Sequence, residues 1–235
     1  KGKHKYDFHF TITANNDTEV LLNSNGHNVQ VVVSGTHLSD AHSNTYKRIL
    51  EDGFKIVDKI DSLFSTDRVV QRSKGIGILI QGLTQTIERV NPDIIIVLGD
   101  REESLAASIV GNYMEKLVAH IAGGDPVYGN SDDPVRFAVS KLAHIHFTFT
   151  NTHSENLLKI GEESFRIFNT GNPALVNIHS TKNLGKLELI KELKIKNENY
   201  IVLIKHPLSS EYDMANEQME ITLDALKYFC IENDF

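Results

Sequence analysis

The stretch that decides the fold is Asp93-Ile94-Ile95-Ile96-Val97-Leu98-Gly99-Asp100-Arg101. An apolar run of strand length without polar interruptions is typical of a parallel strand that helices cover on both faces. Asn91-Pro92 ends the helical pattern before it, because proline disfavours the helical conformation in the residue that precedes it. The sequence therefore predicts a helix, a buried strand and an acidic turn at the carboxyl end of that strand.

Two further acidic segments follow the same pattern. The next apolar run ends at Ile121 and leads into Gly123-Gly124-Asp125, and a helix then opens on Asp132-Asp133-Pro134. Open parallel sheets bind ligands in the crevice outside the carboxyl ends of their strands. We therefore expect these carboxylates to gather at one edge of the sheet, where a ligand binds.

Across the chain, apolar runs of strand length alternate with longer helical patterns, which indicates βαβ units and an α/β fold. The predicted strands are 6–13, 28–33, 55–60, 93–98, 116–121, 145–149, 166–168 and 200–204. The predicted shorter helices are 102–114, 133–143, 152–160, 184–193 and 214–230. The longest helix should begin at an N-cap at Ser65 or Thr66 and carry one apolar face made of Ile76, Leu79, Leu83, Ile87 and Val90.

Two domains are expected, a Rossmann-like domain at 1–180 and the start of a second domain at 181–235. The segment 180–199 is the most charged and least apolar part of the chain, as is typical of a boundary. The apolar run 200–204 would then begin a new sheet, with a single helix after it. On this interpretation the second domain is truncated.

Composition excludes several classes of protein. The chain has 24 basic and 31 acidic residues, and its formal net charge of −7 argues against a nucleic acid or an anionic membrane as partner. Cys230 is the single cysteine, which excludes a disulfide within the chain and fits the cytoplasm. No signal segment or membrane helix is indicated. Neither a dinucleotide-binding glycine motif nor a P-loop is present, so a nucleotide-dependent dehydrogenase is not expected.

Each of these carboxylates could have either a structural role or a role at the ligand site. Asp100 could reach a ligand from the strand end, or it could cap the helix that begins at Glu102. Proline favours the first helical position, so Pro134 assigns Asp133 to the N-cap and leaves Asp132 as the freer group. Arg136 could bind ligand oxygens or pair with Asp133 on the helix surface.

Other polar residues also allow more than one role. Ser140 lies on the same helical face as Arg136, so both should face the cleft. Gly123-Gly124 allows either a close backbone approach to a ligand or merely a tight turn. The histidines at positions 120, 144 and 146 would need a common direction to bind a metal, and strand alternation argues against that. We expect neither a metal ion nor a cofactor.

Taken together, these motifs resemble those of the UDP-N-acetylglucosamine 2-epimerases, and of the hydrolysing branch in particular. The matching segments run from about residue 31 to the end of the chain: 91–101, 119–125, 132–136 with 140–144, 171–173, and Lys205-His206-Pro207. The resemblance implies a glycosyltransferase-B-like fold with a nucleotide sugar, UDP-N-acetylglucosamine or a relative, between two Rossmann-like halves. It implies elimination of UDP and addition of water to give N-acetylmannosamine, in a homo-oligomer that feeds sialic-acid-type synthesis.

The resemblance also assigns roles to residues. Asp100 and Asp132 are the implied acid–base groups, since elimination needs a base for the proton on C2 and addition of water needs a proton donor. His206 would contact the leaving diphosphate from the second domain. The implied substrate-binding residues are Arg101, Gly124, Asp125, Asp133 and Arg136.

Some features depart from the family pattern. Ala122 stands where many relatives have a polar residue. The arginine that relatives carry in the loop after the first strand is not present at Asn15-Asn16-Asp17, and the first helix, with an apolar patch only at 20–22, looks shortened. The serine-rich loop and the acidic residue that hold the nucleotide in relatives are not among these residues, so we expect this chain to bind UDP weakly. The alternatives are a non-hydrolysing epimerase and a sugar-nucleotide-binding fragment without turnover.

Overall fold

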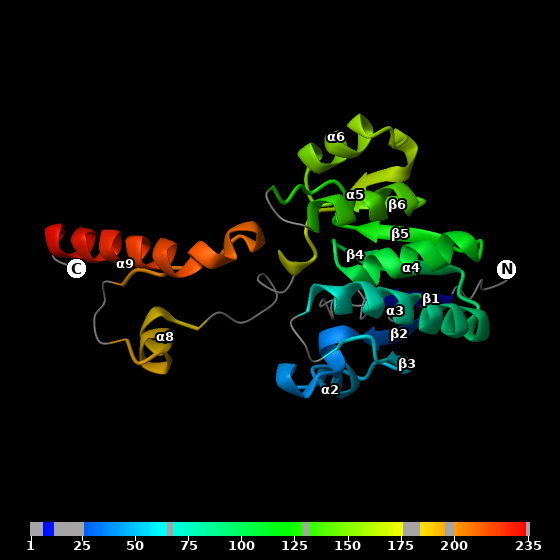
Figure 1. Ribbon diagram of the computed structural model, residues 1–235, viewed down its shortest axis with the longest axis horizontal. Helices are drawn as coiled ribbons and strands as arrows, with labels where there is room; N and C mark the ends of the chain where they lie inside the picture. Colours follow the sequence, from blue (N-terminus) through cyan, green and yellow to red (C-terminus); the bar gives the residue numbers. More distant parts are fainter. Residues whose placement is uncertain are drawn as a thin grey trace. The chain divides into compact units, whose positions relative to one another are not determined.

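The computed structural model describes residues 7–11, 26–64, 68–128, 132–175, 184–195 and 200–233. The chain divides into two compact units, one made of residues 1–127 and 132–178 and the other of residues 128–131 and 179–235 (Figure 1). Each unit is described by itself below.

The first unit is built on a parallel sheet of seven strands in the order β3-β2-β1-β4-β5-β6-β7. Its strands are β1 (Asp7–Thr11), β2 (Asn28–Ser34), β3 (Ile56–Ile60), β4 (Ile94–Leu98), β5 (Leu117–Ile121), β6 (Ile145–Thr148) and β7 (Ile167–Asn169). The predicted strands of this unit are confirmed to within two residues where the structure describes them; residues 6, 12 and 13 lie outside. The strand order reverses between β1 and β4, so the carboxyl ends of these two strands flank the expected ligand crevice.

The helices of this unit follow the predicted pattern. They are α2 (Tyr46–Glu51), α3 (Val69–Val90), α4 (Glu102–Tyr113), α5 (Asp132–Leu142) and α6 (Asn151–Lys159), with the 3-10 helices η1 (Gly35–Leu38), η2 (Asp40–His42) and η3 (Ser164–Arg166). Helix α2 was not predicted, because its short sequence buries only Ile49. The predicted caps of the long helix, Ser65 and Thr66, lie outside the described residues, and Arg68 holds the N-cap position instead.

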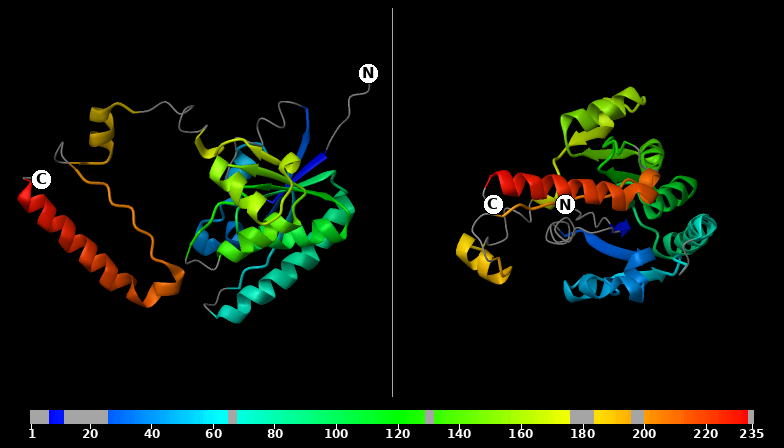
Figure 2. Two further views of the ribbon diagram at one scale, coloured as in Figure 1. Left: turned by 90° about the horizontal axis from the view of Figure 1, so that it is seen from above. Right: turned by 60° about the vertical axis from the view of Figure 1, so that its left-hand side comes forward.

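The predicted apolar face of α3 is confirmed at three of its five residues, while Ile76 and Val90 are half-buried. Leu79, Leu83 and Ile87 are almost completely buried and join a core with Ile95 and Val97 of β4. Helices α3 and α4 pack side by side on one face of the sheet (Figure 2). Asn91 ends α3 in the left-handed conformation (φ 51°), which asparagine adopts at helix ends more readily than most residues. The apolar periodicity of this sequence therefore determines which face of α3 is buried.

The second unit contains helices but no strand among its described residues. Its elements are α8 (Lys186–Glu192), η4 (Ser209–Met214) and α9 (Ala215–Glu232). The predicted strand at 200–204 is wrong, since residues 200–208 form no strand. A strand needs a neighbour to complete its backbone hydrogen bonds, and the described part of this unit offers none. Val202 and Ile204 are accordingly exposed.

The domain limits 1–180 and 181–235 stay a prediction from the sequence. The residues of the predicted loop at 15–17 and of the apolar patch at 20–22 fall outside the described residues. None of the helices that the structure describes is long and apolar enough to cross a membrane.

Candidate active site

The candidate site lies at the carboxyl edge of the first unit's sheet. Four side chains from different elements form what we call the edge cluster: Asp100 after β4, Asp125 after β5, Arg136 on α5 and His153 on α6. Gly99 turns the chain sharply after β4 with a φ of 73°. The predicted meeting of polar groups from separate crossover units is observed for Asp100, Asp125 and Arg136.

Arg136 is the centre of the edge cluster. Its residue is 7% exposed, and its guanidinium forms an ion pair with Asp100 through Nη2. Its Nη1 donates to the carbonyl of Ala122 (3.0 Å) and lies 3.7 Å from Oδ2 of Asp125. The alternative pairing of Arg136 with Asp133 is therefore wrong, because the side chain turns inward toward the neighbouring strand ends and not along the helix surface.

Asp100 does not cap the helix that follows it. Arg101 occupies the N-cap position of α4, with no hydrogen bond from its side chain to the helix. The Asp100 carboxylate instead faces the guanidinium of Arg136, and its side chain is 18% exposed. The ion pair fixes the direction of this carboxylate at the sheet edge.

Asp133 has a structural contact, although not the predicted one. Helix α5 begins at Asp132, so Asp133 lies inside the first turn and not at the N-cap. Its Oδ1 accepts a hydrogen bond from the backbone N–H of Val127 (2.8 Å), which ties the preceding loop to the helix. Pro134 is tolerated one position further in, because N–H groups of the first turn have no helical partner.

Asp132 acts electrostatically on Arg101. Burial by itself would lower the pKa of the Arg101 guanidinium, but the carboxylates of Glu103, Glu102 and Asp132 raise it above its ordinary value. The Arg101 Nε lies 3.6 Å from Oε2 of Glu103 and 3.9 Å from Oε2 of Glu102. The charge of Arg101 therefore lies near the carboxylates of Glu103, Glu102 and Asp132.

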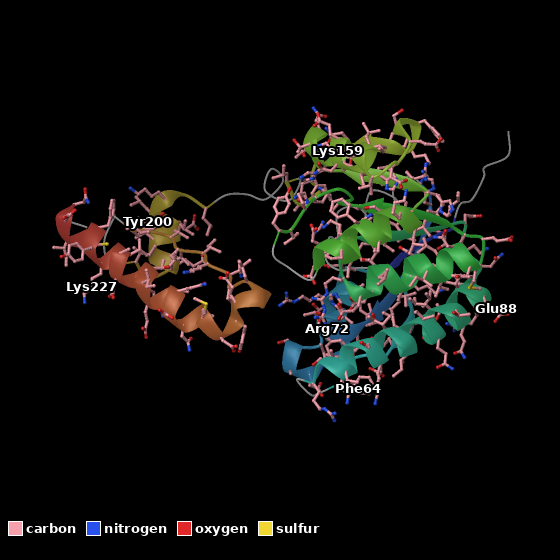
Figure 3. The ribbon with its side chains drawn as sticks, turned by 45° about the horizontal axis from the view of Figure 1, so that its top comes forward. Phe64, Arg72, Glu88, Lys159, Tyr200 and Lys227 are labelled. Atoms are coloured by element: carbon pink, nitrogen blue, oxygen red, sulfur yellow. The ribbon has the colours of Figure 1, made fainter. Side chains whose placement is uncertain are left out.

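A pocket opens beside Arg101 at the same edge of the sheet. Its lining includes Gly35, Thr36, Ser62, Gln71, Arg101 and Glu103, together with Phe64 and Arg72, which Figure 3 labels. Oε1 of Gln71 is buried there and has no hydrogen-bond partner among the described residues, whereas Oε2 of Glu103 forms its ion pair with Arg101. An unsatisfied buried acceptor suits a ligand with hydroxyl or amide N–H donors.

His120 and Ser140 form a buried support beneath the edge cluster. His120 Nε2 donates to the carbonyl of Gly99 (2.8 Å), and its Nδ1 is hydrogen-bonded with Ser140 Oγ (3.1 Å). Ser140 is completely buried, so the expectation that it faces the cleft with Arg136 is wrong. Its hydroxyl also donates to the carbonyl of Arg136 one turn earlier on α5 (3.0 Å), and its bond with His120 holds α5 against β5.

The three histidines of the possible metal cluster have separate partners. His144 Nδ1 accepts from the backbone N–H of Val118 (3.1 Å), while His146 Nε2 bonds Oε2 of Glu162 (3.0 Å). Over the described ranges, no three or more histidine, cysteine or acidic side chains are placed to hold a metal ion.

The burial of His120 should make the free energy of unfolding decrease as the pH falls. Burial, together with the nearby charges of His146 and Arg136, lowers the pKa of His120 to about 3 despite its bond to Gly99. An unfolded imidazole titrates near pH 6.5, so below that pH the unfolded chain binds a proton that the folded chain does not. His120 should therefore make the free energy of unfolding fall by about 1.4 kcal/mol per pH unit between about pH 6 and pH 4.

Urea unfolding from pH 7 to pH 4.5 measures this slope. His120→Gln keeps a donor for the Gly99 carbonyl but does not titrate, so its slope should be shallower by about that amount. Equal slopes in the two proteins would contradict the assignment.

His153 belongs to the edge cluster but was not predicted from the sequence. Its Nε2 lies 3.4 Å from Oδ1 of Asp125, and its side chain is 16% exposed. The position of His153 in the sequence could have indicated this. It lies in the first turn of α6, just after β6 ends, and so at the same sheet edge as the acidic turns.

Gly124 is explained by packing. Its φ is 75°, and a Cβ added there would lie 2.2 Å from the carbonyl oxygen of His153. Its own carbonyl accepts from Asn156 Nδ2 of α6 (3.0 Å). Both contacts fix the first turn of α6 against the loop after β5, which favours the tight-turn reading.

Gly124→Ala should therefore destabilise the fold strongly. We expect a loss of about 2 to 4 kcal/mol, from a left-handed conformation that alanine resists and from steric overlap with the backbone of α6. Gly161→Ala is the matched control, because Gly161 has a φ of 88° but open space around it. Thermal unfolding of both variants measures the part of the loss in stability that comes from the steric overlap. Equal losses of stability in the two variants would show that the overlap has no effect.

His206 lies in the second unit, in the exposed segment 200–208. Its predicted contact with a leaving diphosphate stays a prediction.

Comparison with known proteins identifies the family. The sequence profile of the UDP-N-acetylglucosamine 2-epimerases matches residues 20–231. The GDP/UDP-N,N'-diacetylbacillosamine 2-epimerase (hydrolyzing) of Campylobacter jejuni is 34% identical over 88% of this chain and 55% of its own length. The UDP-N,N'-diacetylbacillosamine 2-epimerase (hydrolyzing) of Legionella pneumophila is 31% identical over 87% of this chain and 55% of its own length. The chain thus spans about half the length of these relatives.

Solved structures share the fold. The UDP-GlcNAc 2-epimerase of Neisseria meningitidis bound to UDP-GlcNAc aligns with a TM-score of 0.61 and 23% identity, over 82% of this chain and 52% of that chain. The enzyme of Methanocaldococcus jannaschii in complex with UDP-GlcNAc and UDP aligns with a TM-score of 0.65 and 18% identity, over 80% and 53%. These likenesses confirm the predicted glycosyltransferase-B-like fold class. By the match over residues 20–231, this chain belongs to the UDP-N-acetylglucosamine 2-epimerase family.

Proposed function

We propose that the protein is a hydrolysing 2-epimerase of a UDP-linked 2-acetamido sugar. A base removes the proton from C2, the bond between C1 and the diphosphate oxygen breaks, and UDP leaves with that electron pair to give a glycal. Water then adds its hydroxyl to C1, and an acid returns a proton to C2 on the opposite face. The products are UDP and the free sugar of inverted configuration at C2.

The observation that carries this proposal is the placement of two separate carboxylates at the carboxyl edge of the sheet. Asp100 is oriented by Arg136, and Asp132 lies within the electrostatic reach of Arg101. Carboxylates in different surroundings can divide the base and acid roles of an elimination followed by an addition. We assign Asp100 and Asp132 to these two proton transfers.

The other predicted residues complete the proposed site. Arg101, Gly124, Asp125, Asp133 and Arg136 are assigned to binding or shaping the sugar site. For Gly124 and Asp133 the observed contacts support a shaping role, since one packs against α6 and the other binds the Val127 backbone. His206 is assigned to the diphosphate.

Two substrates are supported by different observations. The family profile favours UDP-N-acetylglucosamine. N-acetylmannosamine as its product and a use in sialic-acid-type synthesis are what the sequence resemblance implies. The two relatives at 34% and 31% identity are named for N,N'-diacetylbacillosamine, which favours a diacetamido trideoxy sugar as the second candidate. A cytoplasmic homo-oligomer remains an expectation from the sequence resemblance.

Product chromatography tests the proposal. The protein is incubated with millimolar UDP-N-acetylglucosamine and, separately, with UDP-N,N'-diacetylbacillosamine, so that weak binding is still saturated. Free 2-epimerised sugar together with UDP is the expected result for one of them. An epimerised sugar still attached to UDP would assign the non-hydrolysing reaction, and unchanged substrate in both would refute an enzymatic role.

A further inference from the structure

We propose that His153 is a positioning residue that sets the direction of the Asp125 carboxylate, as a second donor opposite Arg136. The inference rests on the proposed function for its catalytic consequence, but the pairing itself is a property of the fold.

The position of His153 is fixed by its backbone. Its N–H donates to the Oγ1 of Thr150, which caps α6 (3.2 Å). Its carbonyl lies so close to Gly124 that a side chain there would overlap it. Leu157, one turn along α6, is completely buried. The imidazole therefore stands at a rigid place relative to the loop that carries Asp125.

Asp125 lies between two basic groups on different helices. Its Oδ1 is 3.4 Å from Nε2 of His153, and its Oδ2 is 3.7 Å from Nη1 of Arg136. Both separations exceed the 2.7 to 2.9 Å that is common for a charge-assisted hydrogen bond. With a side chain 35% exposed, Asp125 keeps the capacity to accept a donor from a ligand. Two basic groups thus lie near the Asp125 carboxylate, and its oxygens can still accept a hydrogen bond from a ligand.

Asp100 is held differently. Its Oδ2 is in direct contact with Arg136 Nη2, and its side chain is less exposed, at 18%. Arg136 is thus in direct contact with Asp100 but lies 3.7 Å from the nearer oxygen of Asp125. On our proposal, His153 supplies the second contact that orients Asp125.

The ring nitrogens of His153 have distinct surroundings. Nε2 faces the carboxylate, whereas Nδ1 is buried and has no hydrogen-bond partner among the described residues. The ring of Phe149 lies beside the imidazole, 6.4 Å away between centroids. A neutral imidazole in this setting carries its proton on Nε2, the nitrogen that faces Asp125, since a buried Nδ1–H would be left unpaired.

Ring nitrogen-15 NMR tests the pairing without any substrate. We expect the Nε2–H tautomer for His153 in the wild-type protein and a clear shift of its Nε2 resonance in Asp125→Asn. An Nδ1–H tautomer, or a His153 signal that Asp125→Asn leaves unchanged, would overturn the proposal. If the wild-type protein releases no UDP from either sugar nucleotide, the proposed function fails while this readout still decides the pairing.

Three variants of α6 test the catalytic consequence. His153→Leu removes the donor, so kcat for UDP release should fall about 10- to 100-fold with little change in KM, as for a misdirected group. His153→Gln restores an N–H donor at the same reach and should return kcat to within about threefold of wild type. Glu155→Leu, at an exposed position two residues along, should leave kcat unchanged.

Thermal unfolding of the same variants shows whether a loss of kcat comes from a loss of folded protein. The positioning role would be overturned if kcat fell equally in His153→Gln and His153→Leu. It would also be overturned if both variants kept full activity.

Discussion

Asp132→Asn should lower UDP release by at least about 10³-fold, because the asparagine amide neither removes nor returns a proton. The fold should be retained, since asparagine keeps the shape of the side chain and is accepted in the first turn of a helix. The rate is measured as UDP released from saturating sugar nucleotide, and folding by thermal unfolding.

Asp133→Asn is the matched control, one position along the same helix. The asparagine Oδ1 can still accept the N–H of Val127, so we expect a loss of about 1 kcal/mol or less and retained UDP release. Equal loss of activity in both variants would contradict the separation of roles between the two aspartates.

Glu162→Ala should cost about 2 to 3 kcal/mol of unfolding free energy, because it removes a buried carboxylate with three donors and leaves the buried ring nitrogen of His146 without its acceptor. Glu162 has a side chain that is 1% exposed, and it accepts hydrogen bonds from Lys141 (2.5 Å), His146 (3.0 Å) and Arg166 (2.8 Å). Burial would raise the pKa of this carboxyl group, but its bonds to Lys141 and His146 bring the pKa below its ordinary value. Its stabilisation is therefore present at neutral pH and lost as the pH falls through that lowered pKa.

Glu163→Ala provides the comparison. Its side chain is 66% exposed and lies 3.5 Å from Arg166 Nε, so its removal should change stability by no more than about 0.5 kcal/mol. Urea unfolding at pH 7 measures both variants. A loss below about 1 kcal/mol for Glu162→Ala would mean that the buried cluster contributes little to stability.

The parts of the fold that the sequence predicts are those that local pattern determines. The uninterrupted apolar run before Gly99 and the 3.6-residue periodicity of Leu79, Leu83 and Ile87 each specify an element and its buried face. The acidic turns after two neighbouring strands then place Asp100 and Asp125 at one edge.

The features that could not be predicted depend on partners far away in the sequence. Arg136 pairs with Asp100, 36 residues earlier, and not with the nearer Asp133. His153 becomes part of the cluster only because Gly124 lets α6 approach the loop after β5. The run 200–204 has the local pattern of a strand, but a strand also requires a partner that periodicity does not reveal.

The most direct test of the account is the fate of the C2 proton. The protein converts its sugar nucleotide in deuterium oxide, and the released sugar is analysed by mass spectrometry and proton NMR. Elimination followed by addition predicts one deuterium at C2 of the free 2-epimerised sugar, in a product that Asp100→Asn does not form. Free sugar that retains hydrogen and its original configuration at C2 would contradict the proposed role of these carboxylates.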